Sequence, residues 1–255
     1  MKESVENTLS FLGGTTLLAG QVLRELCRWP FPTKLTMEQI YQVGIRSIPL
    51  VFITAASTGM VMSLQFGLGL EKFGGKMYVP KIVSLSIIRE MGPVFTCLML
   101  AARVGAGITS EIGSMTVTQQ IDALRALGTS PIKKVVLPRV FACMIAIPLL
   151  VALANTIGVI GGLIVGANDL GLDPRFYVQK IFETVTLADY FSGFAKAPFF
   201  ALAISIVACY YGLSVREGTR GVGSATTRSV VTSSIFILVG DYLLTKGFWV
   251  LGQWL

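Results

Sequence analysis

The chain has 255 residues, of which 53% are hydrophobic and only 14% charged. A soluble domain carries about 25% charged residues, and a helix of roughly 20 apolar residues crosses a bilayer. Composition and several uncharged runs of that length therefore predict a polytopic helical membrane protein. We ascribe the net charge of +7 to basic residues at helix ends rather than to nucleic-acid binding, because no basic patch is interleaved with aromatic residues.

The cysteine and histidine content excludes several kinds of site. The chain has no histidine, and its four cysteines lie far apart without any C-x-x-C spacing (Cys27, Cys97, Cys143 and Cys209). A zinc site and a histidine-based catalytic triad are excluded on this ground. The first ten residues, MKESVENTLS, mix charges and do not predict a cleavable signal peptide.

The N-terminal segment predicts a helix that lies on one membrane face. Residues 4–28 place apolar side chains at helical spacing, although Gly13 and Gly14 weaken the pattern midway. The sequence WPFPT (29–33) should end this helix, because two prolines cannot continue it. Trp29 and Phe31 suit the membrane interface. The alternative interpretation is a leader segment without a role.

Five membrane spans are predicted from the uncharged runs. The third is long enough to tilt, and the second is interrupted by Arg89 and Glu90. The predicted spans are 47–70, 82–102, 140–168, 197–215 and 229–252.

Lys and Arg are distributed unequally between the two predicted sides. Thirteen lie in 1–46, 103–139 and 216–228, against seven in 71–81, 167–196 and 246–255. The bias predicts a cytoplasmic N-terminus and an external C-terminus.

A short amphipathic helix is predicted in the polar segment between the second and third spans. Val117, Ile121 and Leu124 share one helical face, Gly128 is placed as the C-terminal stop, and Pro131 follows. Such a helix suits docking into a groove on a partner protein. The residues alone equally allow a helix that rests on the headgroups.

Arg89 and Glu90 stand in the otherwise apolar run SIIREMGPVF (86–95). A charge in hydrocarbon costs about 3 kcal/mol or more, and adjacent helix residues do not face each other. We interpret them as part of a cavity for a polar lipid headgroup, with Arg89 meeting the phosphate and Glu90 setting the polarity. The alternative is an ion pair that holds two spans together. Gly92-Pro93 can free backbone groups nearby, and Gln65 is a further candidate for a headgroup hydrogen bond.

Two other features of the spans indicate close packing or function. Gly158, Gly162 and Gly166 repeat at four-residue spacing, a face where helices approach closely, either within one subunit or between two. Asp241 is expected to face protein or a cavity, or to pair with Lys246 near the helix end.

Several motifs resemble one family. EIGSM-x-VT-x-QIDAL-x-x-LG-x-x-P followed by LPRV, together with SIIREMGP, AARVGAGITSEIG and ATTRSVV, is similar to the MlaE-type permeases. These are membrane subunits of ABC transporters that move phospholipids between the membranes of Gram-negative bacteria and chloroplasts. The resemblance covers about residues 40–250.

The resemblance implies one permease domain over 1–255, with an interfacial helix and elbow (1–34) and a transmembrane region (35–255). The expected assembly is a homodimer in the bacterial inner membrane, with an ABC ATPase that binds the ATP, a periplasmic ring of MCE-domain protein, and room for a regulatory subunit on the ATPase. The phospholipid would bind in an outward-facing cavity near the dimer interface, lined by the first, second and fifth spans. Its expected ligands are Arg89, Glu90 and Gln65.

The same resemblance makes Glu111–Leu127 the coupling helix, seated in the ATPase. The residues expected to couple are Glu111, Thr118, Ile121, Asp122 and Leu124. The sequence contains no P-loop, since in GLEKFGGKM (69–77) Gly75 displaces Lys76 and Met77 replaces Ser or Thr. We therefore expect no ATPase site and no cofactor in this chain.

Two rival functions follow from the residues. A stand-alone channel or proton-coupled carrier would use Arg89, Glu90 and Asp241 as relay groups. An intramembrane enzyme acting on lipid is disfavoured, because the sequence offers no plausible nucleophile and base pair.

Overall fold

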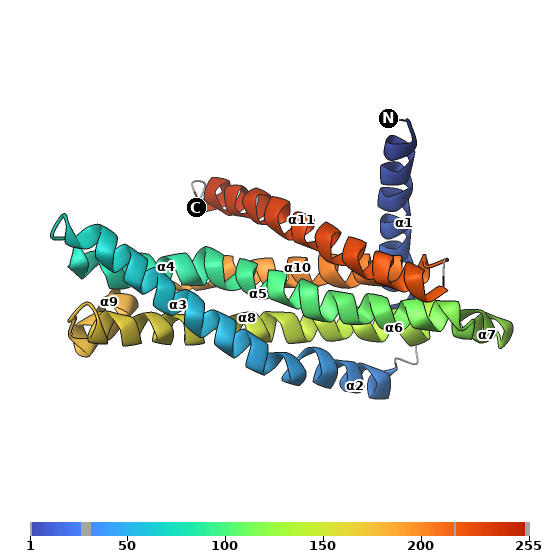
Figure 1. Cartoon of the computed structure of the whole chain (residues 1–255), viewed down its shortest axis with the longest axis horizontal. Coiled ribbons are helices and arrows are strands. Elements are labelled where there is room, and N and C mark those ends of the chain that lie inside the picture. The colour runs from blue at the N-terminus through green and yellow to red at the C-terminus, as the bar shows by residue number, and fades with distance from the viewer. Residues whose placement is uncertain (1, 27–31, 217, 253–255) are drawn as a thin grey trace. The chain divides into compact units, whose positions relative to one another are not determined.

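The computed structural model describes residues 2–26, 32–216 and 218–252, and every regular element in them is helical (Figure 1). The WPFPT break, with Trp29 and Phe31, falls largely outside the described residues. The α-helices are α1 (Lys2–Leu26), α2 (Thr33–Val43), α3 (Ile48–Glu71), α4 (Val79–Ser86), α5 (Gly92–Leu100), α6 (Ala106–Val117), α7 (Gln120–Ala126), α8 (Leu137–Asn168), α9 (Pro174–Thr184), α10 (Leu187–Leu213) and α11 (Gly218–Gly252).

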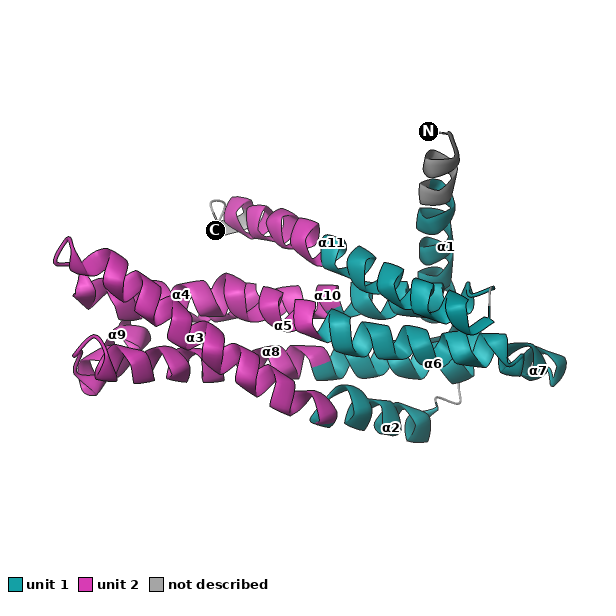
Figure 2. Ribbon diagram, in the orientation of Figure 1, with its two compact units in different colours: residues 1–45, 100–146, 201–236 teal, residues 46–99, 147–200, 237–255 magenta. Residues whose placement is uncertain are grey.

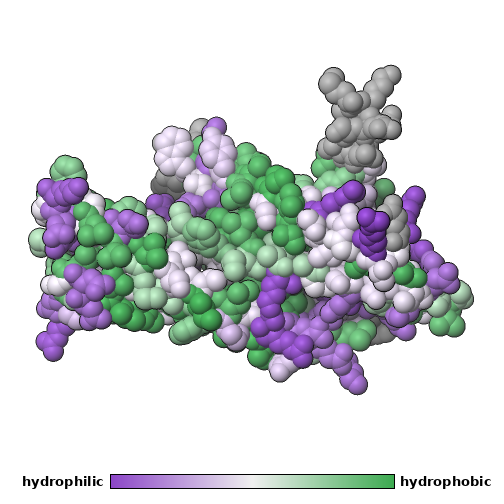
Figure 3. All heavy atoms as spheres, in the orientation of Figure 1, coloured by the Kyte–Doolittle hydropathy of each residue, from purple (hydrophilic) through white to green (hydrophobic). Residues whose placement is uncertain are grey.

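Five helical stretches of the described residues are long and apolar enough to cross a membrane, which confirms the predicted number of spans. They are Thr33–Glu71, Lys76–Val117, Ile132–Asn168, Leu187–Leu213 and Gly218–Val250. Wide apolar areas cover the face shown in Figure 3. Each stretch begins or ends beyond the uncharged run that predicted it, because a helix continues into polar surroundings as long as its backbone hydrogen bonds continue.

Shorter helical forms interrupt these stretches. Residues Ile87–Met91, Ala101–Gly105 and Ile132–Val136 are π-helical, and Ile45–Ser47 and Lys76–Tyr78 form single 3₁₀ turns. A π-helical turn inserts an extra residue into an α-helix and is frequent at functional sites. The first of these turns contains both Arg89 and Glu90.

The chain divides into two compact units (Figure 2). Unit 1 comprises residues 1–45, 100–146 and 201–236, and unit 2 comprises 46–99, 147–200 and 237–255. The expectation of one domain over 1–255 stays a prediction.

In unit 1, the N-terminal helix α1 is packed onto the protein. It contacts the π-helical turn Ile132–Val136, and its residues Leu18 and Val22 are buried. A second contact joins α6 to α11, where the hydroxyl of Thr109 lies 2.9 Å from that of Ser229. Both hydroxyls are buried away from water, so this hydrogen bond provides each of them with a partner.

In unit 2, helix α4 packs between α3 and α9. The hydrophobic core around α4 contains Val79, Val83, Ile87 and Leu170. The backbones of α3 and α8 approach closely at Gly59. A Cβ added there would collide with the carbonyl of Gly158.

The three spaced glycines of α8 face elements of the same unit. A Cβ added at Gly158 would meet Ile87 at 3.1 Å, and one at Gly162 would meet both Val83 and the hydroxyl of Tyr177 at 3.1 Å. Gly166 lies against the Tyr177 ring. Of the two neighbours left open by the sequence, the glycines therefore contact their own subunit.

Candidate functional site

The π-helical turn Ile87–Met91 places Arg89 and Glu90 in unit 2. Pro93 has no amide hydrogen, so the donor that an α-helix would supply to the Arg89 carbonyl, four residues earlier, is missing. The ammonium of Lys196, on α10, donates to this carbonyl instead at 3.1 Å. The Gly92-Pro93 step thus leaves a backbone acceptor that another span satisfies.

Lys196 is the centre of a charged cluster. Its side chain is only 2% exposed, and its Nζ lies 2.6 Å from Glu90 Oε2, 2.8 Å from Asp241 Oδ1 and 2.7 Å from Thr245 Oγ1. Thr245 also lies 3.3 Å from the other oxygen of Glu90. We call these four residues the Lys196 cluster. A buried ammonium requires such partners, because isolated it would be strongly destabilising.

The close approach of α10 to the π-helical turn depends on a glycine. A Cβ at Gly193 would collide with the carbonyl oxygen of Ile88. Because Gly193 and Lys196 are three residues apart, they lie on one face of α10. The glycine therefore brings the lysine within reach of Arg89 and Glu90.

Arg89 points to a different partner. Its Nε lies 3.3 Å from Asp189 Oδ1, while its side chain remains 53% exposed. The other oxygen of Asp189 accepts hydrogen bonds from the amide and the hydroxyl of Thr186, at 2.9 and 2.7 Å. Asp189 thus fixes the start of α10 and orients Arg89, leaving the guanidinium with donors to spare.

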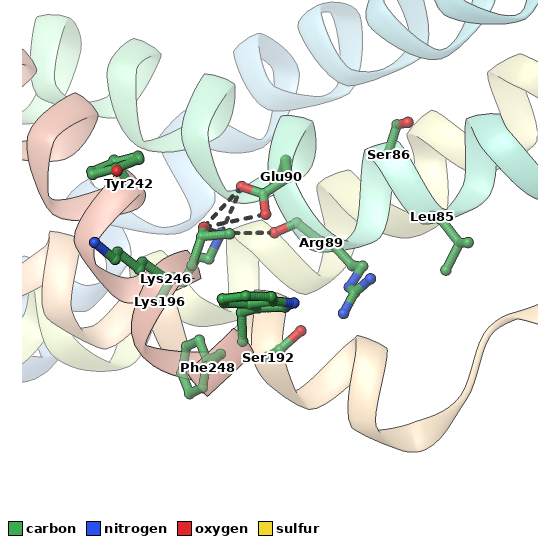
Figure 4. Close-up of a pocket in the computed structure, with 11 residues that line it drawn as sticks. Leu85, Ser86, Arg89, Glu90, Ser192, Lys196, Tyr242, Lys246 and Phe248 are labelled. Atoms are coloured by element: carbon green, nitrogen blue, oxygen red, sulfur yellow. Dashed lines mark hydrogen bonds and ion pairs between the residues drawn. The ribbon is translucent and has the colours of Figure 1, made fainter. Parts of the chain in front are cut away.

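These charges border a cavity of about 490 Å³, which we call the Lys196 cavity (Figure 4). Aromatic residues of α11 provide much of its apolar wall. Lys246 has no ion-pair partner among the described residues, so it and Arg89 are the cations that remain available to a ligand. The lining residues are Leu85, Ser86, Arg89, Glu90, Ser192, Lys196, Tyr242, Thr245, Lys246, Phe248 and Trp249.

The Lys196 cavity differs in two respects from the lipid cavity that the sequence analysis expected. Its walls come from the second, fourth and fifth spans of one chain, whereas the first, second and fifth were expected. Gln65, on α3, is exposed and does not line it. Of the two readings of Asp241, the structure shows the first: Asp241 faces protein and binds Lys196. Lys246, five residues on, lies on a different face of the helix.

The segment expected to form one coupling helix is broken. Helix α6, which contains Glu111, ends at Val117, and Gln119 has a left-handed backbone with φ 57° before α7 begins. Thr118 therefore lies in the turn, while Ile121, Asp122 and Leu124 belong to α7. A left-handed residue is incompatible with a continuous right-handed helix.

The expected stop at Gly128 is confirmed. Gly128 has φ 70°, its amide donates to the Arg125 carbonyl at 2.9 Å, and the Thr129 amide donates to the Leu124 carbonyl at 3.0 Å. These two hydrogen bonds define a Schellman motif.

The side chains of this segment fall into two groups. Glu111 binds Arg139 at 3.0 Å and Ile121 is only 3% exposed, so both contact their own chain. Asp122 pairs with Arg125 at 2.9 Å on the surface, and Leu127 is 78% exposed. The surface that α7 offers to a partner is thus its exposed face, with Leu127 directly after its last residue.

Comparisons with known proteins agree with one another. The family model described as Permease MlaE matches residues 36–246. A probable ABC transporter permease of Rickettsia conorii is 40% identical over 237 residues, covering 93% of this chain and 92% of the relative. The intermembrane phospholipid transport system permease protein MlaE of Haemophilus influenzae is 34% identical, with 91% and 88% covered. The chloroplastic protein TRIGALACTOSYLDIACYLGLYCEROL 1 of Arabidopsis thaliana is 28% identical, with 91% and 66% covered.

Proposed function

The chain belongs to the MlaE family of ABC transporter permeases, and on that premise we propose that it moves phospholipids between the inner and outer membranes of a bacterium. The observation that supports this substrate is the Lys196 cavity, which combines exposed cations with aromatic walls. The name of the Haemophilus influenzae relative points the same way.

In this proposal Arg89 binds the lipid phosphate. Its guanidinium is half exposed at the cavity and is oriented by Asp189, and guanidinium groups bind phosphate through charge-assisted hydrogen bonds. Lys246 adds a second positive charge. Glu90 is held by Lys196, so its role in this proposal is to hold the lysine in place rather than to contact the headgroup. The aromatic residues of α11 receive the apolar part of the ligand.

The assembly that we propose is a homodimer in the inner membrane, with its N-terminus in the cytoplasm. A separate ABC ATPase, with or without a regulatory subunit, binds the ATP and contacts the α7 region. An MCE-domain ring receives the lipid outside. The Lys196 cavity would then open toward the second subunit and the ring.

A stand-alone proton-coupled carrier is the alternative. Its relay groups would be Arg89, Glu90 and Asp241, and a relay requires carboxylates that can release and bind protons. Both carboxylates instead bind the same buried ammonium, so neither stands as a separate relay group. This pairing favours the ATP-driven permease.

The experiment is lipid transfer between vesicles that contain the reconstituted chain with its ATPase. Transfer should require ATP hydrolysis, and Arg89→Gln should lower it about tenfold, since a lost charge-assisted hydrogen bond is worth about 1.5 kcal/mol or more. Arg175→Gln, an exposed arginine outside the cavity, is the matched control. Transfer driven by a pH gradient without the ATPase would overturn the proposal.

A further inference from the structure

Unit 1 contains a second cavity, of about 390 Å³, which we call the α1 cavity. It lies where helix α1 meets the end of α10 and the first turns of α11. The lining residues are Ser10, Phe11, Tyr210, Tyr211, Ser214, Val215, Arg216, Gly221, Ser224, Ala225 and Arg228.

Helix α1 is fixed as one wall of this cavity by aromatic contacts. The Phe11 ring meets Tyr210 edge-on at 5.3 Å and stacks on Tyr211 at 5.4 Å. Gly14 allows the close approach, because a side chain there would collide with the Tyr210 ring. The Tyr210 hydroxyl also donates to the Ser10 carbonyl at 3.4 Å. These specific contacts hold α1 in place as one wall of the cavity.

Among the described residues that line the α1 cavity, the charged ones are Arg216 and Arg228. Glu217, next to Arg216 in the sequence, lies outside the described residues. Both arginines are exposed, and neither has an ion-pair partner among the described residues. The hydroxyls of Ser214 and Ser224 lie on the same lining, while Gly221 and Ala225 leave space beside them.

This set of groups suits a phosphate. Guanidinium groups and hydroxyls are the side chains that most often bind phosphate oxygens. Two arginines without an ion-pair partner among the described residues also favour a ligand with net negative charge.

The surroundings of the cavity indicate that the phosphate belongs to a lipid. The outer face of α1 exposes large apolar side chains, which in water would be unfavourable and at a membrane surface are typical of an interfacial helix. They include Leu9 at 64%, Leu17 at 69% and Leu23 at 64% exposure. A basic pocket between helices at the membrane surface is the kind of site that binds anionic lipid headgroups.

We propose that the α1 cavity binds the phosphate-bearing headgroup of an anionic phospholipid from the leaflet in which α1 lies, through Arg216 and Arg228. This site is separate from the Lys196 cavity and does not depend on the function proposed above. The bound lipid bridges α1 to the α10–α11 connection and so holds the N-terminal helix in place.

The test is native mass spectrometry of the full-length chain in detergent, titrated with phosphatidylglycerol. The variant Arg216→Gln/Arg228→Gln should weaken the retention of one bound lipid at least tenfold relative to the unaltered chain. Arg220→Gln is the matched control, because Arg220 lies in the first turn of α11 and is exposed but does not line the cavity. The thermal unfolding of all three proteins should be alike without added lipid, since the substituted arginines are exposed and unpaired.

A second arm distinguishes a lipid from a free anion. Inorganic phosphate should fail to displace the bound phosphatidylglycerol at concentrations that exceed the lipid a hundredfold. Equal lipid retention by the double variant and by Arg220→Gln overturns the proposal. Displacement by inorganic phosphate overturns the assignment to a lipid and makes the cavity a site for a soluble phosphate.

Discussion

Lys196 and Arg89 meet through the backbone: the lysine ammonium donates to the Arg89 carbonyl at 3.1 Å, where Pro93 removes the α-helical donor. One lysine thus performs two tasks. It completes the hydrogen bonding of the second span, and it balances two carboxylates from the second and fifth spans. In unit 2 the fourth span is therefore joined to both of the others by a single buried side chain.

Lys196→Met should strongly destabilise the protein, because Glu90 and Asp241 would lose the cationic partner that they share. Removal of one member of a buried ion pair costs about 3–5 kcal/mol, and the lower end applies here because the Glu90 side chain is 34% exposed. Thermal unfolding in detergent measures the loss. The matched control is Lys180→Met, which removes an exposed pair with Glu183 and should change the stability little.

The triple variant Lys196→Met/Glu90→Gln/Asp241→Asn separates charge from packing. With all three charges removed, much of the lost stability should return, because no unpaired carboxylate remains. A triple variant as unstable as Lys196→Met alone would mean that the aliphatic packing of Lys196, and not its charge, holds the three spans together.

The sequence could reveal two of the four residues of the Lys196 cluster. Glu90 and Asp241 stand out because charges are rare in apolar runs. Lys196 lies immediately before the apolar residues 197–215 and was therefore assigned to an external loop. Its partners are 45 and 106 residues away in the chain, and no local pattern encodes a contact of that range.

Gly193→Ala should push α10 away from the π-helical turn, because the new methyl group would collide with the Ile88 carbonyl. Overpacking of this kind costs about 1–3 kcal/mol, and here the neighbour is backbone and cannot rotate aside. Gly69→Ala, in α3, is the control: no atom lies within 4 Å of its added Cβ, and alanine favours a helix by up to about 1 kcal/mol. Opposite shifts of the unfolding temperature are expected, and a neutral Gly193→Ala would contradict the close approach.

Helix boundaries show a second limit of the sequence. The apolar stretch 229–252, which contains Asp241 and Lys246, predicted the start of the last span, yet α11 begins at Gly218. Absence of charge marks the part of a helix that lipid can surround, whereas the helix itself ends where a backbone conformation stops it. Gly128 was recognisable as such a stop, because glycine readily adopts a positive φ, but the left-handed Gln119 was not.

Tyr177 should make the protein sensitive to alkali. Burial raises the pKa of its hydroxyl, with the Ser63 hydroxyl acting in the opposite direction. The folded chain then keeps this proton to higher pH than the unfolded chain, whose tyrosines titrate near pH 10. The stabilising contribution is complete below that pH and is lost as the pH rises through the raised pKa.

Tyr177→Phe should therefore flatten the loss of stability above about pH 10, as measured by urea unfolding at a series of pH values. Tyr78→Phe is the control, because Tyr78 is 63% exposed. If the two variants lost stability along the same pH curve, ionisation of the buried hydroxyl would play no part in alkaline unfolding.

Leu127→Asp should weaken binding of the ATPase without unfolding the permease. Leu127 directly follows α7 and is 78% exposed, so the substitution removes an apolar side chain from the surface at α7 while disturbing little within the chain. Burial of a leucine side chain in an interface is worth about 1.5–3 kcal/mol, which corresponds to roughly 10- to 100-fold weaker binding. Leu187→Asp, at a leucine that is 91% exposed in unit 2, provides the same chemical change outside this surface. Co-purification of the ATPase with each variant measures the effect, and equal recovery with both would mean that the ATPase binds elsewhere than at the end of α7.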